Sequence, residues 1–512
     1  MEEWKPKYSP WVTAWPVLMA VFMFALNETI SNVALANIAG SLSISMNEST
    51  WIITSYLMAS GIAIALVGFM TKLLGRKMLL ISCVLLFTVS SLACAVSQSM
   101  LMMVVSRFFQ GVGGGALLPL GQAIILEIFP PNERQKAMAI FGLVFIIAPI
   151  VGPIMGGWIT ENWCWQWIFL IDIPLGLVCS LWNYKIVEDP PYARKQTNVL
   201  IDYKGIVFLS LWLISMQIVL DKGNDADWFG STWICWLTTF SVICATLFFI
   251  SQFDKKNKEP LLNLRILKDS TYFWGTFIQV ILMAVFLASA TLLPSMLQNL
   301  MGYTSYLSGL SLGTRGVGNI IALITYFVIA QKLGDRRIAA IGLFFLGLGS
   351  WYFGMINLEI NLTSIAFPNI CYGIGIFFAL TPLVPLSCAT IDNRELTNAS
   401  ALQNLLKNTG GAIGTSISTT MISRFSQVHQ MMMSGHLNYT NDVYMAKLHA
   451  SVNALANSMD ISSAQYMANY IMYGELLKQA RLWGYVDTFR WFAVATFLLI
   501  PLLFFIKKPK RS

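Results

Sequence analysis

The stretch FALNETISNVAL, residues 24–35, lies in an apolar run that begins near Trp11, and Glu28 stands in the middle of it with Asn27 beside it. A spanning helix needs about 20 mostly apolar residues, and an ionisable residue within one is a functional candidate because burying its charge is costly. The small residues of ALA at 34–36 resemble a signal-peptide cleavage site. The run before them exceeds an h-region of about 7–15 residues and Glu28 interrupts it, so we expect a retained first transmembrane helix.

The composition places the chain in a broad class. Of its 512 residues, 56% are hydrophobic and only 11% are charged, whereas soluble domains carry about 25% charged residues. The excess of 33 Lys and Arg over 25 acidic residues is typical of the cytoplasmic loops of membrane proteins and does not require nucleic acid. Eight scattered cysteines and three histidines lack metal-ligand or disulfide spacing. We therefore predict a polytopic all-α membrane protein with no bound metal.

Apolar segments of spanning length recur along the whole chain. Lys and Arg gather in alternate connecting segments, so the orientation with both termini in the cytoplasm leaves few basic residues outside. The sequence predicts fourteen spans, which centre near Val21, Ile62, Phe87, Gly111, Ile147, Leu177, Leu213, Ala245, Met283, Ile320, Leu346, Phe377, Ile413 and Ala495.

This count divides the chain into segments. We expect a cytoplasmic N-terminus (1–10), a six-helix bundle (11–190), two inserted helices with linkers (191–270), a second bundle (271–506) and a basic tail (507–512).

The second bundle contains a long outer segment, residues 426–484. Apolar residues recur in it at spacings of 3 and 4, which predicts an amphipathic helix. Two interpretations stay open, a lid on the outer face and a docking surface for a partner. The residues with this spacing are Met445, Leu448, Val452, Leu455 and Met459.

Several classes of membrane protein lack support in the sequence. There is no GxxxxGK[ST] phosphate loop, no large soluble domain, no selectivity filter and no catalytic cluster within the spans. Secondary transport without a cofactor is the class that remains, driven by an ion gradient. Glycine and proline within the spans permit the close helix packing that such transporters need.

Motifs along nearly the whole chain resemble the major facilitator superfamily, and specifically its EmrB/QacA branch of 14-span drug:proton antiporters. Besides FALNETISNVAL, these are GFMTKLLGRK (68–77), RFFQGVGGG (107–115), PPNER (130–134), APIVGPIMGG (148–157), WIFLIDIPLG (167–176) and LDKGNDADWF (220–229). The resemblance implies two six-helix bundles related by pseudo-symmetry, with spans seven and eight inserted between them.

The resemblance also implies conformational motifs. The turn after span two supplies Gly68, Gly75, Arg76 and Lys77, and the antiporter motif of span five supplies Gly152, Pro153, Gly156 and Gly157. The chain departs from the family where Asn27 and Lys72 replace its usual aspartates.

Depth along the spans suggests a proton-coupling site. Glu28 lies roughly 12 Å from an end of span one near Ala36, and Arg107 lies roughly 9 Å into span four, so we expect the two charges to pair. A proton taken up by Glu28 from outside would drive export, whereas the alternative is a purely structural pair. Asn27 belongs to this site, and Asp172 is either a second titrating group or, as we favour, an interfacial charge.

The substrate site is expected to be an apolar cavity with a few polar groups. Arg315 is either an anion ligand or a structural partner of a helix end. The other candidates for its lining are Trp51, Tyr56, Gln110, Gln122, Asn319 and Gln403.

These features together predict a proton-coupled exporter of hydrophobic or amphiphilic drugs in a bacterial inner membrane. The resemblance implies a periplasmic adaptor of the EmrA type and a TolC-like outer-membrane channel as partners. Two alternatives stay open, an exporter of a specific metabolite such as a fatty acid or siderophore, and a non-transporting membrane scaffold.

Overall fold

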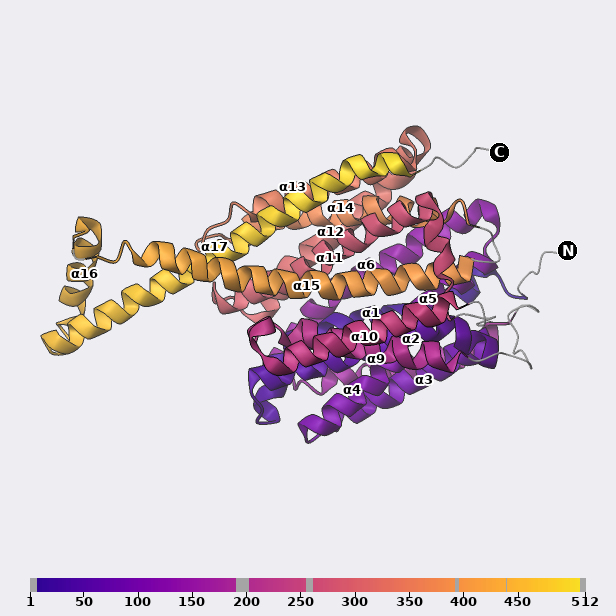
Figure 1. Ribbon diagram of the computed structural model, residues 1–512, viewed down its shortest axis with the longest axis horizontal. Coiled ribbons are helices and arrows are strands. Elements are labelled where there is room, and N and C mark those ends of the chain that lie inside the picture. Colours follow the sequence, from indigo (N-terminus) through magenta and orange to yellow (C-terminus); the bar gives the residue numbers. More distant parts are fainter. Residues whose placement is uncertain (1–6, 190–201, 255–260, 392–395, 439, 507–512) are drawn as a thin grey trace.

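The computed structural model describes residues 7–189, 202–254, 261–391, 396–438 and 440–506, and all regular structure within them is helical (Figure 1). Eleven segments are long and apolar enough to cross a membrane. Three more long helices (α6, α13 and α15) have 32, 19 and 39 residues. The number fourteen stays a prediction. The basic tail (507–512), most of the N-terminal segment and the linker after residue 189 lie outside the described residues.

The first half of the chain builds one group of helices. Spans four and six are each broken in two, the former at Ala116, next to Gly115 and three residues before Pro119. The helices are α1 (Pro10–Ser41), α2 (Met46–Leu74), α3 (Arg76–Ala95), α4 (Met100–Gly115), α5 (Leu117–Ile128), α6 (Pro131–Asn162), α7 (Trp167–Leu170) and α8 (Asp172–Ile186).

The remaining helices comprise an inserted pair and a second group, with short 3-10 turns at Trp228–Gly230, Leu264–Lys268 and Leu503–Phe505. The inserted pair is α9 (Tyr203–Lys222) and α10 (Thr232–Phe253). The second group is α11 (Ser270–Asn299), α12 (Ser305–Leu333), α13 (Asp335–Phe353), α14 (Leu362–Cys388), α15 (Leu396–Ser434), α16 (Asp442–Leu455) and α17 (Ile461–Leu502).

Polar residues at the ends of the apolar runs start many of these helices. The first backbone N–H groups of a helix have no intrahelical acceptor, so a side-chain oxygen before the helix supplies one. Ser45 and Glu48 cap each other reciprocally at α2, and Asp269, Thr304 and Asn361 cap α11, α12 and α14. These capping residues lie at the ends of the apolar segments. The ends of these helices therefore agree with the ends of the apolar segments in the sequence.

Of three buried apolar clusters among the described residues, two divide the bundle, and the third joins α2, α9, α10, α11 and α15. The first is built by α1–α8 and the second mainly by α11–α15 and α17. The halves meet where α2 packs on α15 and α6 packs on α12. The inserted pair, α9 and α10, packs on itself, and its apolar windows are the least buried of the candidate spans, as expected for an addition to the outside of the bundle.

Glycines set how closely α4 approaches α2. A Cβ on Gly111 would lie 2.4 Å from the backbone oxygen of Tyr56, and one on Gly115 would lie 2.4 Å from that of Ser60. Small residues at such crossings let helix backbones touch. The RFFQGVGGG motif therefore holds the turn that carries Arg107 directly against α2.

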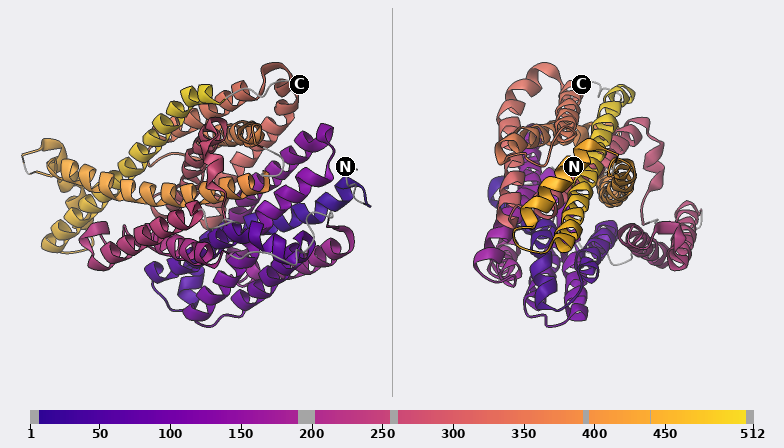
Figure 2. Two further views of the ribbon diagram at one scale, coloured as in Figure 1. Left: turned by 45° about the vertical axis from the view of Figure 1, so that its right-hand side comes forward. Right: turned by 90° about the vertical axis from the view of Figure 1, so that its left-hand side faces the viewer.

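The long outer segment forms a projection and not a lid. Figure 1 shows α15 and α17 running well beyond the other helices, with α16 at their far end, opposite the start of α1 and the end of α17. The left view of Figure 2 shows the same projection standing clear of the bundle. The predicted amphipathic helix is present as α16 up to Leu455, and Leu448 on its apolar face is buried against this projection.

We call the end of the bundle with the first turn of α1 and the last turn of α17 the terminal end, and the opposite end the projection end (Figure 1). Both described ends of the chain lie on one side, as an even number of crossings requires. In the predicted orientation, the terminal end is cytoplasmic.

Candidate functional site

A cavity of about 490 Å³ lies between the two halves of the bundle. Its walls come mainly from α1, α5 and α6 of the first half and from α11, α14 and α15 of the second, with one residue each from α2 and α13. Most lining side chains are apolar, among them Phe24, Phe141 and Phe286. A cavity of this size with an apolar wall and few polar groups is typical of sites for amphiphilic small molecules.

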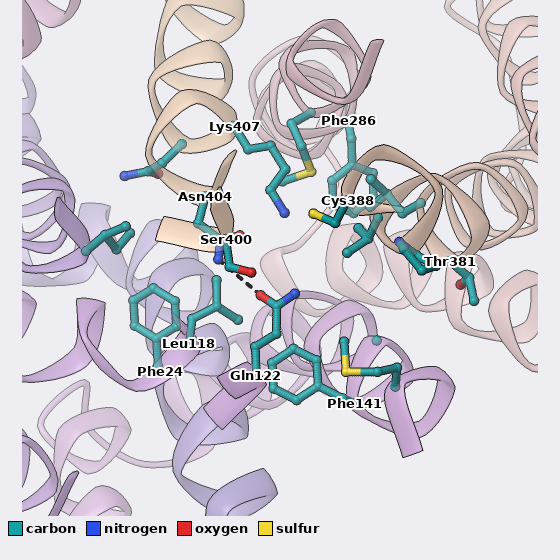
Figure 3. Close-up of a pocket in the computed structure, with 18 of the residues that line it drawn as sticks. Phe24, Leu118, Gln122, Phe141, Phe286, Thr381, Cys388, Ser400, Asn404 and Lys407 are labelled. Atoms are coloured by element: carbon teal, nitrogen blue, oxygen red, sulfur yellow. Dashed lines mark hydrogen bonds between the residues drawn. The ribbon is translucent and has the colours of Figure 1, made fainter. Parts of the chain in front are cut away.

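Amide groups join the two halves across this cavity. Asn404 Nδ2 of α15 donates a hydrogen bond of 3.1 Å to Gln122 Oε1 of α5 (Figure 3). Gln122 thus lines this cavity, and it also links elements that must separate if the halves rock against each other.

Glu28 lines the cavity but does not pair with Arg107. Its side chain is half-buried, and within the described part of the chain it forms no ion pair. The expected Glu28–Arg107 pair is therefore wrong. Successive residues are turned by about 100° around a helix, so Glu28 faces the cavity while Asn27 faces the interior of the first half.

Arg107 is held by a buried polar cluster with Asn27 at its centre. Arg107 Nη1 donates to Gln110 Oε1 at 2.6 Å and to Asn27 Oδ1 at 3.4 Å. Its Nε donates to the backbone oxygen of Ile52, and its Cζ lies 4.2 Å from the ring centroid of Tyr56. The guanidinium is only 1% exposed, so these acceptors and the ring replace its water shell.

Asp172 supplies the acid of this cluster, and its interpretation as an interfacial charge is wrong. The residue is 0% exposed. Asn27 Nδ2 donates to Asp172 Oδ2, and Ser91 Oγ donates to the same oxygen at 3.2 Å. The Asn27 amide therefore bridges the buried acid and the buried base. Asp172 opens α8, right after the short α7, which brings it to this depth.

Other residues predicted for the cavity lie elsewhere in the first half. Gln110 is bound within the Arg107 cluster, where it also donates to Ser91 Oγ at 2.7 Å. Tyr56 is buried, and its hydroxyl donates to the backbone oxygen of Phe24. Trp51 lies under Lys222, whose Nζ is 5.5 Å from the ring centroid. None of these three lines the cavity.

The candidates in the second half also lie outside the cavity lining. Arg315 Nε donates to Asn369 Oδ1 at 2.7 Å, and its Nη1 donates to Ser289 Oγ at 3.2 Å, which favours the structural interpretation of this arginine. Asn319 is fully buried. Gln403 donates to Ser387 Oγ at 2.7 Å.

Lys407 also lines the cavity, although the sequence pattern does not indicate it. A span centred near Ile413 predicts a cytoplasmic position for this lysine. The helix α15 begins earlier, at Leu396, and its first turns are rich in Asn, Gln and Ser, which hid a membrane helix from a search for apolar runs.

The turn motif, residues 68–77, joins α2 to α3, and its residues contact three other parts of the chain. Gly75 has φ +81°, a left-handed conformation that favours glycine. Arg76 forms an ion pair with Glu127 of α5, and the backbone N–H of Lys77 donates to Asp189 Oδ1 at 2.7 Å. A Cβ on Gly68 would lie 3.9 Å from Asn398 Oδ1 of α15, which is an ordinary van der Waals contact.

The antiporter motif of α6 lies between the two halves. A Cβ on Gly152 would lie 2.5 Å from Thr29 Oγ1, and one on Gly156 would lie 2.8 Å from the Ile30 side chain, both on α1. Pro153 touches α12, because a Cβ on Gly309 would lie 2.8 Å from its backbone. Gly157 is buried beside them. The motif thus contacts α1 next to Glu28 and also the second half.

The family model that matches this chain is described as the Major Facilitator Superfamily, and it covers residues 17–415. The chain belongs to the major facilitator superfamily. This confirms the predicted fold class and makes the protein a multi-pass membrane transporter and not an enzyme.

Curated relatives cover nearly the full chain. The multidrug export protein EmrB of Haemophilus influenzae is 30% identical over 96% of this chain and 94% of its own length. The probable multidrug resistance protein EmrY of Escherichia coli is 30% identical, with 98% and 96% covered. The fatty acid resistance protein FarB of Neisseria gonorrhoeae is 28% identical, with 98% and 97% covered. These relatives confirm the predicted EmrB-type branch.

Among solved structures, the human organic anion transporter MFSD10 (TETRAN) superposes with a TM-score of 0.60 at 12% identity. The match covers 97% of this chain and 98% of that one, and it supports the fold.

Proposed function

We propose that this protein is a proton-coupled antiporter that exports hydrophobic or amphiphilic compounds across a bacterial inner membrane. Full-length relatives named as multidrug export proteins support this function. The observation that carries it is the apolar cavity between the two halves, with the Glu28 carboxylate in its wall. The cavity offers room for an amphiphile, and the carboxylate offers a group that a proton can neutralise.

Glu28 is suited to exchange a proton for a substrate. Within the described residues no cation pairs with it, so its ionised form is costly in an apolar wall and either a proton or a cationic ligand relieves that cost. A cationic ligand that enters the cavity then favours loss of the proton. This competition is what antiport needs.

The Arg107 cluster has a different role in this proposal. Asp172, Asn27 and Arg107 form a closed network away from the cavity wall, and their charges balance each other in the interior. Buried acid–base networks of this kind hold elements in register. The cluster ties α1 and α8 to α4, so that the first half moves as one body.

The projection supports the proposal of a tripartite assembly. In the predicted orientation α15, α16 and α17 extend into the periplasm, where an adaptor protein of the EmrA type and a TolC-like channel would receive the substrate. Exposed apolar side chains on it, such as Met431, Tyr466 and Tyr470, give such a partner a surface.

A second candidate function is export of fatty acids. The relative FarB, named for fatty acid resistance, favours it, and the cavity wall of Phe and Met side chains fits an acyl chain.

Proton release tests the first proposal. Purified protein in weakly buffered detergent solution is mixed with tetraphenylphosphonium, an amphiphilic cation, and the pH change is recorded. We expect release from the wild type and from the exposed control variant Glu475→Gln, and none from Glu28→Gln. Unchanged release from Glu28→Gln would place the proton site elsewhere, with Asp172 the next candidate.

A further inference from the structure

Lys407 brings a positive charge into the cavity. It lies on α15, its side chain is half-buried, and Figure 3 shows its amine pointing into the open space beside Cys388 and Asn404. Within the described residues, no carboxylate forms an ion pair with it. A long lysine side chain in a membrane helix usually reaches out to the interface, whereas this one reaches inward.

The acids that share the cavity do not neutralise this lysine. Glu28 and Asp335 also line it, yet neither lies within ion-pair distance of Lys407. Since α1 and α15 both begin at the terminal end, Lys407 lies about two turns nearer that end than Glu28 does. A molecule that enters from the terminal end therefore reaches the ammonium first and the carboxylate later.

The surroundings of Lys407 match an anion with an apolar tail. The side-chain amides of Asn404, on the same helix as Lys407, and of Gln122, on α5 across the cavity, can supply further hydrogen bonds once their mutual bond opens. Beyond them the wall is aromatic and aliphatic. A charged hydrogen bond to an ammonium is stronger than a neutral one, so a single lysine suffices to orient an acid in an apolar site.

We propose that Lys407 forms the anion-binding end of the cavity and holds the carboxylate or phosphate of an amphiphile, with its tail against Phe24, Phe141 and Phe286. This inference rests on the proposed export function for the identity of the cavity as a substrate site. It adds the residue that selects acidic amphiphiles, the class to which the fatty acids of the second candidate function belong.

The test compares an acid with its neutral counterpart. Binding of radiolabelled dodecanoate and dodecanol is measured at neutral pH on protein in phosphatidylcholine nanodiscs, with empty discs subtracted. We expect Lys407→Gln to weaken dodecanoate binding on the order of tenfold and to leave dodecanol binding unchanged. Lys407→Arg should retain most of the affinity, and the exposed control Lys447→Gln should behave as the wild type.

Two results would overturn the inference. An equal loss of affinity for both ligands would show that Lys407 only shapes the cavity, and an unchanged affinity for dodecanoate would show that Lys407 does not bind the acid. Intact dodecanol binding also shows that Lys407→Gln is folded. Nanodiscs that contain phosphatidylglycerol distinguish a free acid from a lipid headgroup as the natural anion. If this lipid inhibits dodecanoate binding to the wild type but not to Lys407→Gln, a lipid headgroup occupies the site. Binding needs no proton gradient, so a failure of proton release from wild type would refute antiport and leave this result standing.

Discussion

Exchange of the acid and the amide between positions 27 and 172 tests the buried cluster most directly. Asn27 Oδ1 lies 3.4 Å from Arg107 Nη1, and Asn27 Nδ2 donates to Asp172 Oδ2. The double variant Asn27→Asp/Asp172→Asn therefore puts a carboxylate in hydrogen-bond contact with the guanidinium and an amide where the acid was. The net charge and the side-chain volumes of the cluster stay the same.

The single variants change the charge of this site. Asp172→Asn removes the acid and leaves Arg107 buried with amide and carbonyl acceptors alone, and losing one member of a buried pair costs about 3–5 kcal/mol. Because Asn27 stands between the two charges here, we expect a smaller loss, about 1–3 kcal/mol. Asn27→Asp places two carboxylates in contact and should be destabilising as well.

The assay is thermal unfolding of the four proteins in one detergent, combined as a double-mutant cycle. We expect the swap to recover most of the stability that either single variant loses, with a coupling of about 1–3 kcal/mol. Losses that simply add would show that the two residues do not act as a unit. A wild-type melting temperature for Asp172→Asn would refute the role of its charge altogether.

Two further predictions concern the cavity and the interface of α6. Glu28→Gln should weaken binding of tetraphenylphosphonium by roughly fivefold or more, because the carboxylate that gives up its proton to the cation is gone, and should leave dodecanoate binding nearly unchanged, because Glu28 is neutral when no cation is bound. Nanodisc binding of both ligands is the readout, and an equal change for the two would contradict a charge effect. Gly152→Ala should destabilise the protein by about 1–3 kcal/mol in thermal unfolding because its new Cβ meets Thr29 Oγ1 at 2.5 Å. Gly142→Ala on the same helix, with nothing within 4 Å of its Cβ, is the control, and a similar loss there would exclude the proposed contact.

The fold followed from the sequence because the physical signals for membrane helices are long and redundant. Apolar runs and basic connecting segments located most helices, and motifs such as RFFQGVGGG sit where glycine lets α4 touch α2. The projection was harder to foresee. Its residues are mixed in polarity, and nothing in the pattern told a lid on the outer face from two helices that simply continue past it.

The candidate site was predicted less well, for a geometric reason. Depth along a helix can be counted from the sequence, but direction around the helix cannot, and the single step from Asn27 to Glu28 decides which side chain meets Arg107. Asp172 was misplaced because it begins a helix after a short break, where a charge usually lies at the interface. Lys407 could not be placed from the sequence, because the first turns of α15 are too polar to be recognised as part of a membrane helix.

The length and continuity of α15 connect the cavity mechanically to the projection. The same unbroken helix of 39 residues carries Lys407 near its beginning and forms one arm of the projection at its end, so it measures roughly 58 Å. About 40 Å of this helix lies beyond Lys407, so a tilt of about 10° centred at Lys407 would move the distant tip by roughly 7 Å. A partner bound to the projection would thus respond to the presence of substrate in the cavity without touching the substrate.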